Sequence, residues 1–234
     1  AAEGVENQTL NGASREDVLL AIERAKTAQA NPAWRNLKAH ERARYLHKIA
    51  DGIEANIDRI SWVQSRDTSK TLGETRALAT SAAATFRYFA AVLETSDELL
   101  TAPRGDYLTY SVHEPLGLVA AITPWNSPIA SDAQKVAPAL AAGNAVLLKP
   151  ASWSPLVALE LARIVDEAGL PKGLFSVLPG SGREVGNLLV EHPDIAKVSF
   201  TGGTSTGRHL AHVAAEKLMP ISLELGGKSP TIVF

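Results

Sequence analysis

Apolar residues in the first part of the chain recur at the spacing of helices that bury one face. Between residues 39 and 63 they lie three or four positions apart, which predicts one long helix. The same spacing predicts a helix over 76–93, and residues 14–17 form the pattern of a capping box ahead of a further apolar run. We expect this part of the chain to be helical, with Trp34 and Trp62 packed between the helices.

From about residue 116 the pattern changes to short apolar runs that alternate with helical segments. Just before this change, residues 106–113 alternate between polar and apolar, as in an exposed strand or one arm of a hairpin. Regular alternation of strand and helix indicates βαβ units, and hence a parallel sheet with helices on both faces. The fold class is therefore α/β, with strands expected at 116–122, 144–148, 174–178, 197–200 and 221–225, and helices at 130–142, 155–168, 183–191 and 207–217.

Glycine, proline or polar residues follow each expected strand. In open parallel sheets, ligands bind at the carboxyl ends of the strands. The turns at 180–182 and 202–203 are rich in glycine and open two of the helices. Glycine lets a phosphate approach the backbone, and a helix N-terminus supplies N–H groups and positive potential. Together with Lys149, which follows an earlier strand, these turns predict a nucleotide site.

Residues 202–207 also resemble two other motifs. The segment 203–207 fits the G-x-S-x-G nucleophile elbow of α/β-hydrolases, but no acid followed by a histidine comes later in the chain. A phosphate-binding P-loop would need Lys and Ser or Thr where this chain has Arg208 and His209. His209 and His212 lack the further ligands of a metal site, so we expect no bound metal and interpret both as surface residues.

Composition narrows the possible classes of protein. The 234 residues are 45% hydrophobic and 21% charged, with a net charge of −2, which is typical of a globular protein and favours neither nucleic acid nor a membrane as partner. No apolar run is long enough to span a bilayer, and the N-terminus lacks the features of a signal peptide, so we expect a cytoplasmic location. The chain holds no cysteine, which excludes disulfides and a cysteine nucleophile within these residues.

Five motifs along the chain resemble the aldehyde dehydrogenase superfamily, and the similarity runs from about Ser14 to the last residue. They are ITPWN (122–126), KVAPALAAGN (135–144), LKP (148–150), VSFTG (198–202) and LELGGKSP (223–230). The resemblance implies a Rossmann-like NAD(P)-binding core at 116–234, an N-terminal helical part of the same domain at 1–98 and a projecting oligomerisation β-arm at 99–115. It also implies that the catalytic domain, with its nucleophilic cysteine, is absent from this chain, which alone is expected to be inactive.

The resemblance further implies a reaction and its residues. Members of this superfamily oxidise an aldehyde to a carboxylic acid with NAD(P)+ through a cysteine thiohemiacetal and a thioester. By resemblance, the Asn126 amide donates to the oxyanion, and Glu224 is the general base that activates water. The residues expected to bind the cofactor are Ile122, Thr123, Pro124, Trp125, Lys149, Ser152, Gly182, Phe200, Thr201, Gly202, Gly203, Thr206, Leu225 and Gly226.

Departures from the family pattern bear on specificity. Ser152 stands where members that prefer NAD usually carry Glu, which repels a 2′-phosphate, so we expect NADP to be tolerated or preferred. Residues after Asn126 are small or polar, notably Ser127, Ala130 and Ser131, which indicates a bulky or polar aldehyde. The arm indicates a homodimer or homotetramer. Two alternatives stay open: a nucleotide-binding module without enzymatic activity, and a reductive relative, against which Glu224 argues.

Overall fold

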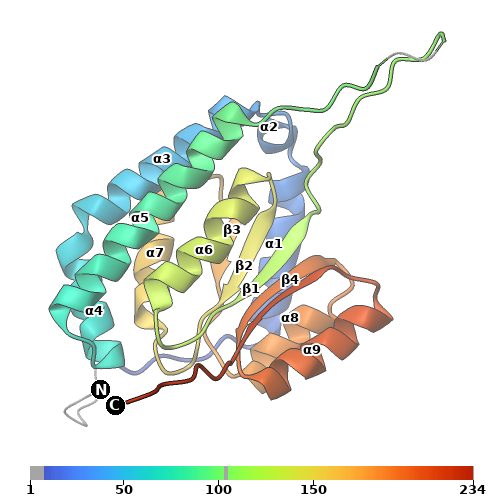
Figure 1. The fold of residues 1–234 in the computed structure, drawn as a ribbon. Helices are drawn as coiled ribbons and strands as arrows, with labels where there is room; N and C mark the ends of the chain where they lie inside the picture. Colours follow the sequence, from blue (N-terminus) through green and yellow to red (C-terminus); the bar gives the residue numbers. More distant parts are fainter. Residues whose placement is uncertain (1–7, 103–104, 234) are drawn as a thin grey trace.

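A parallel sheet forms the centre of the molecule. The computed structural model describes residues 8–102 and 105–233. In this part of the chain, five strands pair in the order β3-β2-β1-β4-β5, all parallel (Figure 1). The strands are β1 (Leu118–Ile122), β2 (Ala145–Lys149), β3 (Phe175–Val177), β4 (Ile195–Gly202) and β5 (Ile221–Leu225). The α/β class and the parallel sheet predicted from the alternating pattern are confirmed.

The register brings the carboxyl ends of the central strands level with one another. Ile122, the last residue of β1, pairs with Lys149 on β2 and with Phe200 on β4. Thr201 on β4 in turn pairs with Glu224 on β5. The segments that leave these strands therefore start from one edge of the sheet.

Helices cover both faces of the sheet, as the crossovers between parallel strands require. One group packs together on one face, with α6 and α7 against the strands and α3, α4 and α5 outside them (Figure 1). The other group, α1, α8 and α9, contacts the strands from the opposite side. The helices are α1 (Arg15–Ala30), α2 (Pro32–Arg35), α3 (Ala39–Ala55), α4 (Ile57–Thr68), α5 (Leu72–Thr95), α6 (Pro128–Ala141), α7 (Leu156–Glu167), α8 (Asn187–Glu191) and α9 (Thr204–Glu216), and a π-helical turn spans Gly182–Gly186.

The helical first part of the chain matches its sequence pattern, with two differences. Ser14 and Asp17 form the expected capping box at the start of α1. The long helix expected over 39–63 is two helices, because the chain turns at Asn56 between α3 and α4. Trp34 is buried and its indole N–H donates to the Gly143 carbonyl at 2.9 Å. Trp62 is 55% exposed and stacks under Arg66, so its predicted burial was wrong.

The projecting arm is extended but is not a regular β-ladder. Leu100 and Tyr110 form an antiparallel bridge, and Ser111 N–H donates to the Leu99 carbonyl. The strand expected over 106–113 is therefore reduced to isolated bridge positions at Tyr107 and Tyr110 in the described residues, while positions 103 and 104 lie outside them. A two-stranded ribbon with no packed face gains little from burial. The arm leaves the body of the domain and exposes Leu99, Leu100, Tyr107, Leu108, Tyr110 and Val112 (Figure 1).

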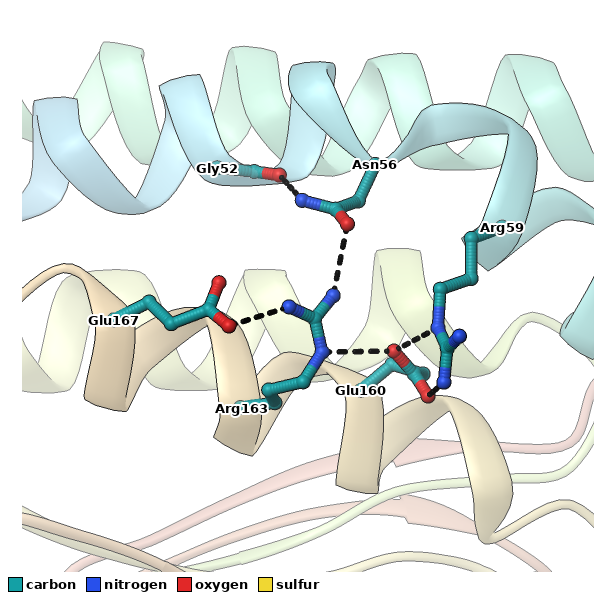
Figure 2. Close-up of polar contacts among 6 residues, drawn as sticks. All are labelled: Gly52, Asn56, Arg59, Glu160, Arg163 and Glu167. Carbon is teal, nitrogen blue, oxygen red and sulfur yellow. Dashed lines mark hydrogen bonds and ion pairs between the residues drawn. The ribbon is translucent and has the colours of Figure 1, made fainter.

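A group of charged side chains ties α7 to the corner between α3 and α4 (Figure 2). Arg59 makes two hydrogen bonds of 2.7 Å to the Glu160 carboxylate, which also accepts from Arg163 at 3.2 Å. Arg163 donates to the Asn56 side-chain oxygen at 2.8 Å as well. Arg59 is the main cause that lowers the pKa of Glu160, whose side chain is only 13% exposed. Glu160 thus links α7 to α4, two helices whose bonded residues lie 101 positions apart in the sequence.

We expect Glu160→Ala to lower the free energy of unfolding by about 2 kcal/mol at pH 7, because three charge-assisted hydrogen bonds are lost at a nearly buried site. The matched control is Glu167→Ala on the same helix, whose carboxylate is 59% exposed and meets Arg163 alone. It should cost less than about 0.5 kcal/mol. Because the folded pKa of Glu160 is lowered, its contribution is present above pH 4.5 and is lost as the pH falls further. Equal losses for the two variants in urea unfolding at pH 7 would contradict this.

Candidate functional site

A cleft of about 840 Å³ opens at the carboxyl ends of the strands. Its size suits a bound small molecule or cofactor. Every residue predicted to act in catalysis or cofactor binding lines it, except Ser152. The lining residues are Ile122, Thr123, Pro124, Trp125, Asn126, Lys149, Ala151, Gly182, Arg183, Gly186, Asn187, Phe200, Thr201, Gly202, Gly203, Ser205, Thr206, His209, Leu210, Glu224, Leu225 and Gly226.

The two predicted catalytic side chains line this same cleft. Asn126 lies in the loop between β1 and α6, and Glu224 lies near the end of β5. In the sheet, β4 separates β1 from β5. Both residues are exposed. The strand order therefore brings an amide and a carboxylate, 98 positions apart in the sequence, to one opening beside Gly202.

Glycines shape the wall of the cleft at the start of α9. Gly203 is the N-cap of α9 without a side-chain hydrogen bond, and a Cβ there would meet no atom within 4 Å. The first-turn N–H groups of α9 consequently have no capping side chain between them and the cleft. At Gly207, by contrast, a Cβ would come within 2.5 Å of a terminal methyl of Leu225, so a larger residue there would displace that side chain between α9 and β5. This close packing places the helix N-terminus at the edge of the sheet.

Lys149 is a buried cation at the end of β2. Its side chain is 4% exposed, and its ammonium donates to the Pro150 carbonyl at 2.8 Å. Burial lowers the pKa of Lys149. Ser152 follows in the next loop but is not part of the lining, and its hydroxyl donates to the Gly180 carbonyl at 2.9 Å. Lys149 therefore lines the cleft together with the other predicted residues, whereas Ser152 is not part of the lining.

Sequence reasoning missed several lining residues on the first turns of helices. Arg183 and Gly186 belong to the π-helical turn. This conformation is rare in proteins overall, but where it occurs it is often at a functional site. His209 on α9, interpreted from sequence as a surface residue, lines the cleft and lies 3.2 Å from the Asn187 side-chain oxygen. These residues could have been predicted from their position in the sequence. Each lies on a helical segment that follows a glycine-rich turn, and such a segment begins at the same edge of the sheet as the end of the preceding strand.

Two buried ionisable groups lie behind the cleft on α6. Asp132 is fully buried, and burial raises its pKa to about 7, against smaller opposing effects of Thr123 and Lys135. Lys135 is 8% exposed and donates to the Ser199 hydroxyl at 3.2 Å. Burial lowers the pKa of Lys135, while Glu224 and Asp132 act in the opposite direction. Glu224, which lines the cleft, therefore interacts electrostatically with Lys135, which is buried in the protein interior.

Two further searches of the described residues concern metals and membranes. No group of three or more His, Cys, Asp or Glu side chains there is arranged to hold a metal ion. Within the same residues, no helix combines the length and the apolar character that crossing a bilayer requires.

The arrangement offers three kinds of chemistry at one opening. Asn126 can donate to a developing oxyanion without changing its charge. Glu224 can accept a proton from water or a thiol. The glycine turns, the start of α9 and Lys149 can bind an anionic, nucleotide-like ligand.

Solved structures of similar fold are found among aldehyde dehydrogenases. PnpE in complex with nicotinamide adenine dinucleotide is 38% identical with a TM-score of 0.92, and 96% of this chain matches 46% of that one. Betaine aldehyde dehydrogenase from Staphylococcus aureus, in complex with NAD+, is 35% identical with a TM-score of 0.91, over 94% of this chain and 45% of that one. Indole-3-acetaldehyde dehydrogenase is 33% identical with a TM-score of 0.94, over 97% of this chain and 53% of that one.

This chain therefore spans about half the length of each of these structures. The profile described as the aldehyde dehydrogenase family matches residues 2–234, nearly the whole chain. Sequence motifs, sheet order, the shared cleft and these comparisons agree, and the chain belongs to the aldehyde dehydrogenase family.

Proposed function

We propose that the protein carrying this chain oxidises an aldehyde to a carboxylic acid with NAD(P)+, and that residues 116–234 form its cofactor-binding core. The observation that carries the proposal is the presence of Asn126, Glu224 and the Gly202-Gly203 turn in the lining of one cleft. The family membership supports the same reaction. Residues 1–98 are its N-terminal helical part, in which α1 packs on one face of the core and α3, α4 and α5 pack over the other, and residues 99–115 are the arm.

The residues of the cleft fit a dinucleotide. At Gly203 an added Cβ would stand in open space, so the backbone before α9 is accessible to a phosphate, and α9 starts with no side-chain cap. Lys149 supplies a cation at the end of β2, near the π-helical turn, since a Cβ on Gly186 would lie 3.6 Å from its side chain. When bound, NAD(P)+ supplies the oxidising power of the reaction.

The chain's own residues would bind and activate the substrate. Asn126 donates its amide N–H to the oxygen that becomes negatively charged when a nucleophile adds to the aldehyde carbon. Glu224 then takes a proton from the water that hydrolyses the acylated enzyme. We propose that a cysteine thiol from outside these residues is the nucleophile, since the chain holds none and forms the thiohemiacetal and thioester only with such a partner.

The function is tested by mixing the intact protein with a panel of aldehydes and either NAD+ or NADP+, and recording cofactor reduction together with carboxylic acid formation. Small aliphatic aldehydes are compared with bulky and polar ones, which the small residues Ser127, Ala130 and Ser131 favour. Cofactor binding without acid formation for any aldehyde would favour the nucleotide-binding module instead. Acylation by acyl phosphate or acyl-CoA, without aldehyde oxidation, would favour a reductive relative.

Cofactor preference follows from Ser152, which carries no charge and lies next to a lining residue, Ala151. We expect the protein to use NADP+ at least as well as NAD+, because Ser152 carries no charge that would repel the 2′-phosphate while Lys149 attracts it. Ser152→Glu should reduce kcat/KM for NADP+ relative to NAD+ by about tenfold or more, since a like charge costs at least about 1.4 kcal/mol at short range. Ser152→Ala is the control and should leave the ratio unchanged. A tenfold preference for NAD+ in the unmodified protein would reject this.

The arm supports a proposal about assembly. Its exposed apolar residues and unpaired backbone suit pairing with another subunit. We propose a homodimer or homotetramer in the cytoplasm, in which the arm contributes to the contact between subunits.

A further inference from the structure

Lys217 donates to three main-chain carbonyls at once, in a part of the domain that the proposed mechanism does not use. Its ammonium lies 3.0 Å from the Val190 oxygen, 2.6 Å from the His192 oxygen and 3.4 Å from the Ile195 oxygen. Val190 belongs to the last turn of α8, and Ile195 is the first residue of β4. The last carbonyls of a helix have no partner within it, and a cation beside them is favourable. Lys217 therefore caps α8 and fastens it to the start of β4.

The turn at the end of α9 directs Lys217 toward α8. Lys217 is the C-cap of α9, and the next residue, Leu218, has a φ of 52°, in the left-handed region that leucine rarely adopts. The Leu218 side chain is 91% exposed, so its burial does not explain this conformation. Backbone strain of this kind persists where the surrounding contacts hold it. The three bonds of Lys217 are among those contacts.

The other ends of α8 and α9, which pack side by side, form part of the cleft (Figure 1). Asn187, the first residue of α8, and His209 on α9 both line the cleft, and the Asn187 oxygen accepts from His209 Nε2 at 3.2 Å. Lys217 comes eight positions after His209, roughly 12 Å further along the helix axis, and does not line the cleft. The two helices are therefore fastened to each other both at the cleft and away from it.

We propose that Lys217 is a positioning residue for the cofactor, which holds α8 at a fixed place along α9 and so sets the separation of Asn187 and His209 in the cleft. Because α8 has only five residues, it is not stable without contacts to its neighbours, and a shift of its last turn moves its first residue. Arg183 and Gly186 lie in the π-helical turn just before α8 and would move with it. The inference rests on the proposed function, in which this cleft holds NAD(P)+.

The first test measures the Kd of NAD+ and of NADP+ by calorimetry on the intact protein. Lys217→Met keeps the length of the side chain and removes the ammonium. We expect the Kd to rise about fivefold, as it can for residues that touch no ligand. The KM for the cofactor should rise in the same proportion, while kcat at saturating cofactor changes by less than about twofold. A purely structural role would lower the free energy of unfolding without changing the Kd of the folded protein.

The matched control is Lys197→Met. Lys197 lies on β4 and donates to the Ser222 hydroxyl at 2.9 Å, so its ammonium bonds to β5 rather than to α8. It does not line the cleft. This variant removes the same charge and one hydrogen bond from the same domain, and it should leave the Kd of both cofactors unchanged.

The second test uses the unmodified protein and stands even if Lys217→Met does not fold. Coupling between two sites is reciprocal, so a cofactor bound in the cleft should stabilise the end of α8 that Lys217 caps. We expect saturating NADP+ to slow hydrogen exchange at the His192 amide, which donates to the Leu189 carbonyl at 3.3 Å and does not line the cleft. The Ala168 amide, at the end of α7, is the control and should exchange at an unchanged rate.

The outcomes separate this inference from the proposed function. A Kd for folded Lys217→Met within about twofold of the unmodified value overturns the inference, and so does a Kd raised equally in Lys197→Met. If Lys217→Met does not fold, unchanged exchange at His192 overturns it, and slowed exchange supports it. A protein that binds NAD(P)+ but oxidises no aldehyde overturns the proposed function, while the Kd of the lysine variants still decides the inference.

Discussion

Glu224→Gln is expected to lower kcat for aldehyde oxidation by about 10²- to 10⁴-fold, the range for loss of a general base. Glutamine keeps the size and the hydrogen-bonding reach of the side chain but cannot accept a proton from water. In the proposed mechanism the base is needed mainly after the cofactor has been reduced, so the acylated enzyme should accumulate. A rapid-mixing experiment should then show one equivalent of reduced cofactor formed quickly, followed by very slow turnover.

The control for this variant is Glu216→Gln. Glu216 is an exposed carboxylate at the end of α9 that does not line the cleft, so its amide variant should retain full activity. If Glu224→Gln keeps a kcat within threefold or so of the unmodified protein, Glu224 is not the base. If the fast phase of cofactor reduction disappears as well, Glu224 is needed before acylation, which would place its role at activation of the thiol.

Asn126→Ala is expected to lower kcat by about 10²- to 10³-fold, as the loss of one oxyanion donor does in other enzymes. Its KM for the cofactor should change little, because the missing amide acts on the transition state rather than on the dinucleotide. Asn126→Asp should be at least as damaging, since a carboxylate offers no donor and repels the negative oxygen. Single-turnover rates measured with saturating cofactor would separate the chemical step from binding.

Asn36→Ala is the control for this second variant, since Asn36 is exposed at the end of α2 and far from the cleft lining. A kcat for Asn126→Ala equal to that of Asn36→Ala would remove Asn126 from the mechanism. An increase in the KM for the cofactor with kcat unchanged would make it a binding residue instead.

The pattern of the sequence was enough to place the strands and the edge of the sheet at which the cleft opens. β5 begins and ends where its apolar run does, and the other strands differ from their expected bounds by a few residues. The reason is that β1 and β2 are buried along their whole length, so each appears as a short apolar run between helices, whereas β5 is an edge strand whose residues alternate. The glycine turns then follow from the chain reversal at the end of each strand.

Local patterns failed where the outcome depends on what packs nearby. The apolar spacing over 39–63 continues through Asn56, yet the chain bends there, and the Asn56 side chain meets Gly52 and Arg163. The residues of the arm have the composition of a strand, but with no third strand beside them the described residues form isolated bridges rather than a regular strand. Ser152 does not line the cleft, and its hydroxyl donates to the carbonyl of Gly180, 28 positions away, a contact that no local pattern contains.

The sequence by itself determined the α/β class and the approximate positions of the strands, because these follow from burial and chain reversal over a few neighbouring residues. The roles of Asn126 and Glu224 come from the resemblance to the family and remain proposals. Only the tertiary structure decided that the strand ends converge in the order β3-β2-β1-β4-β5, and that Asp132 and Lys135 lie buried behind Glu224. Strand order and the burial of a charge are set by contacts between segments far apart in the chain, and no local pattern of residues contains that information.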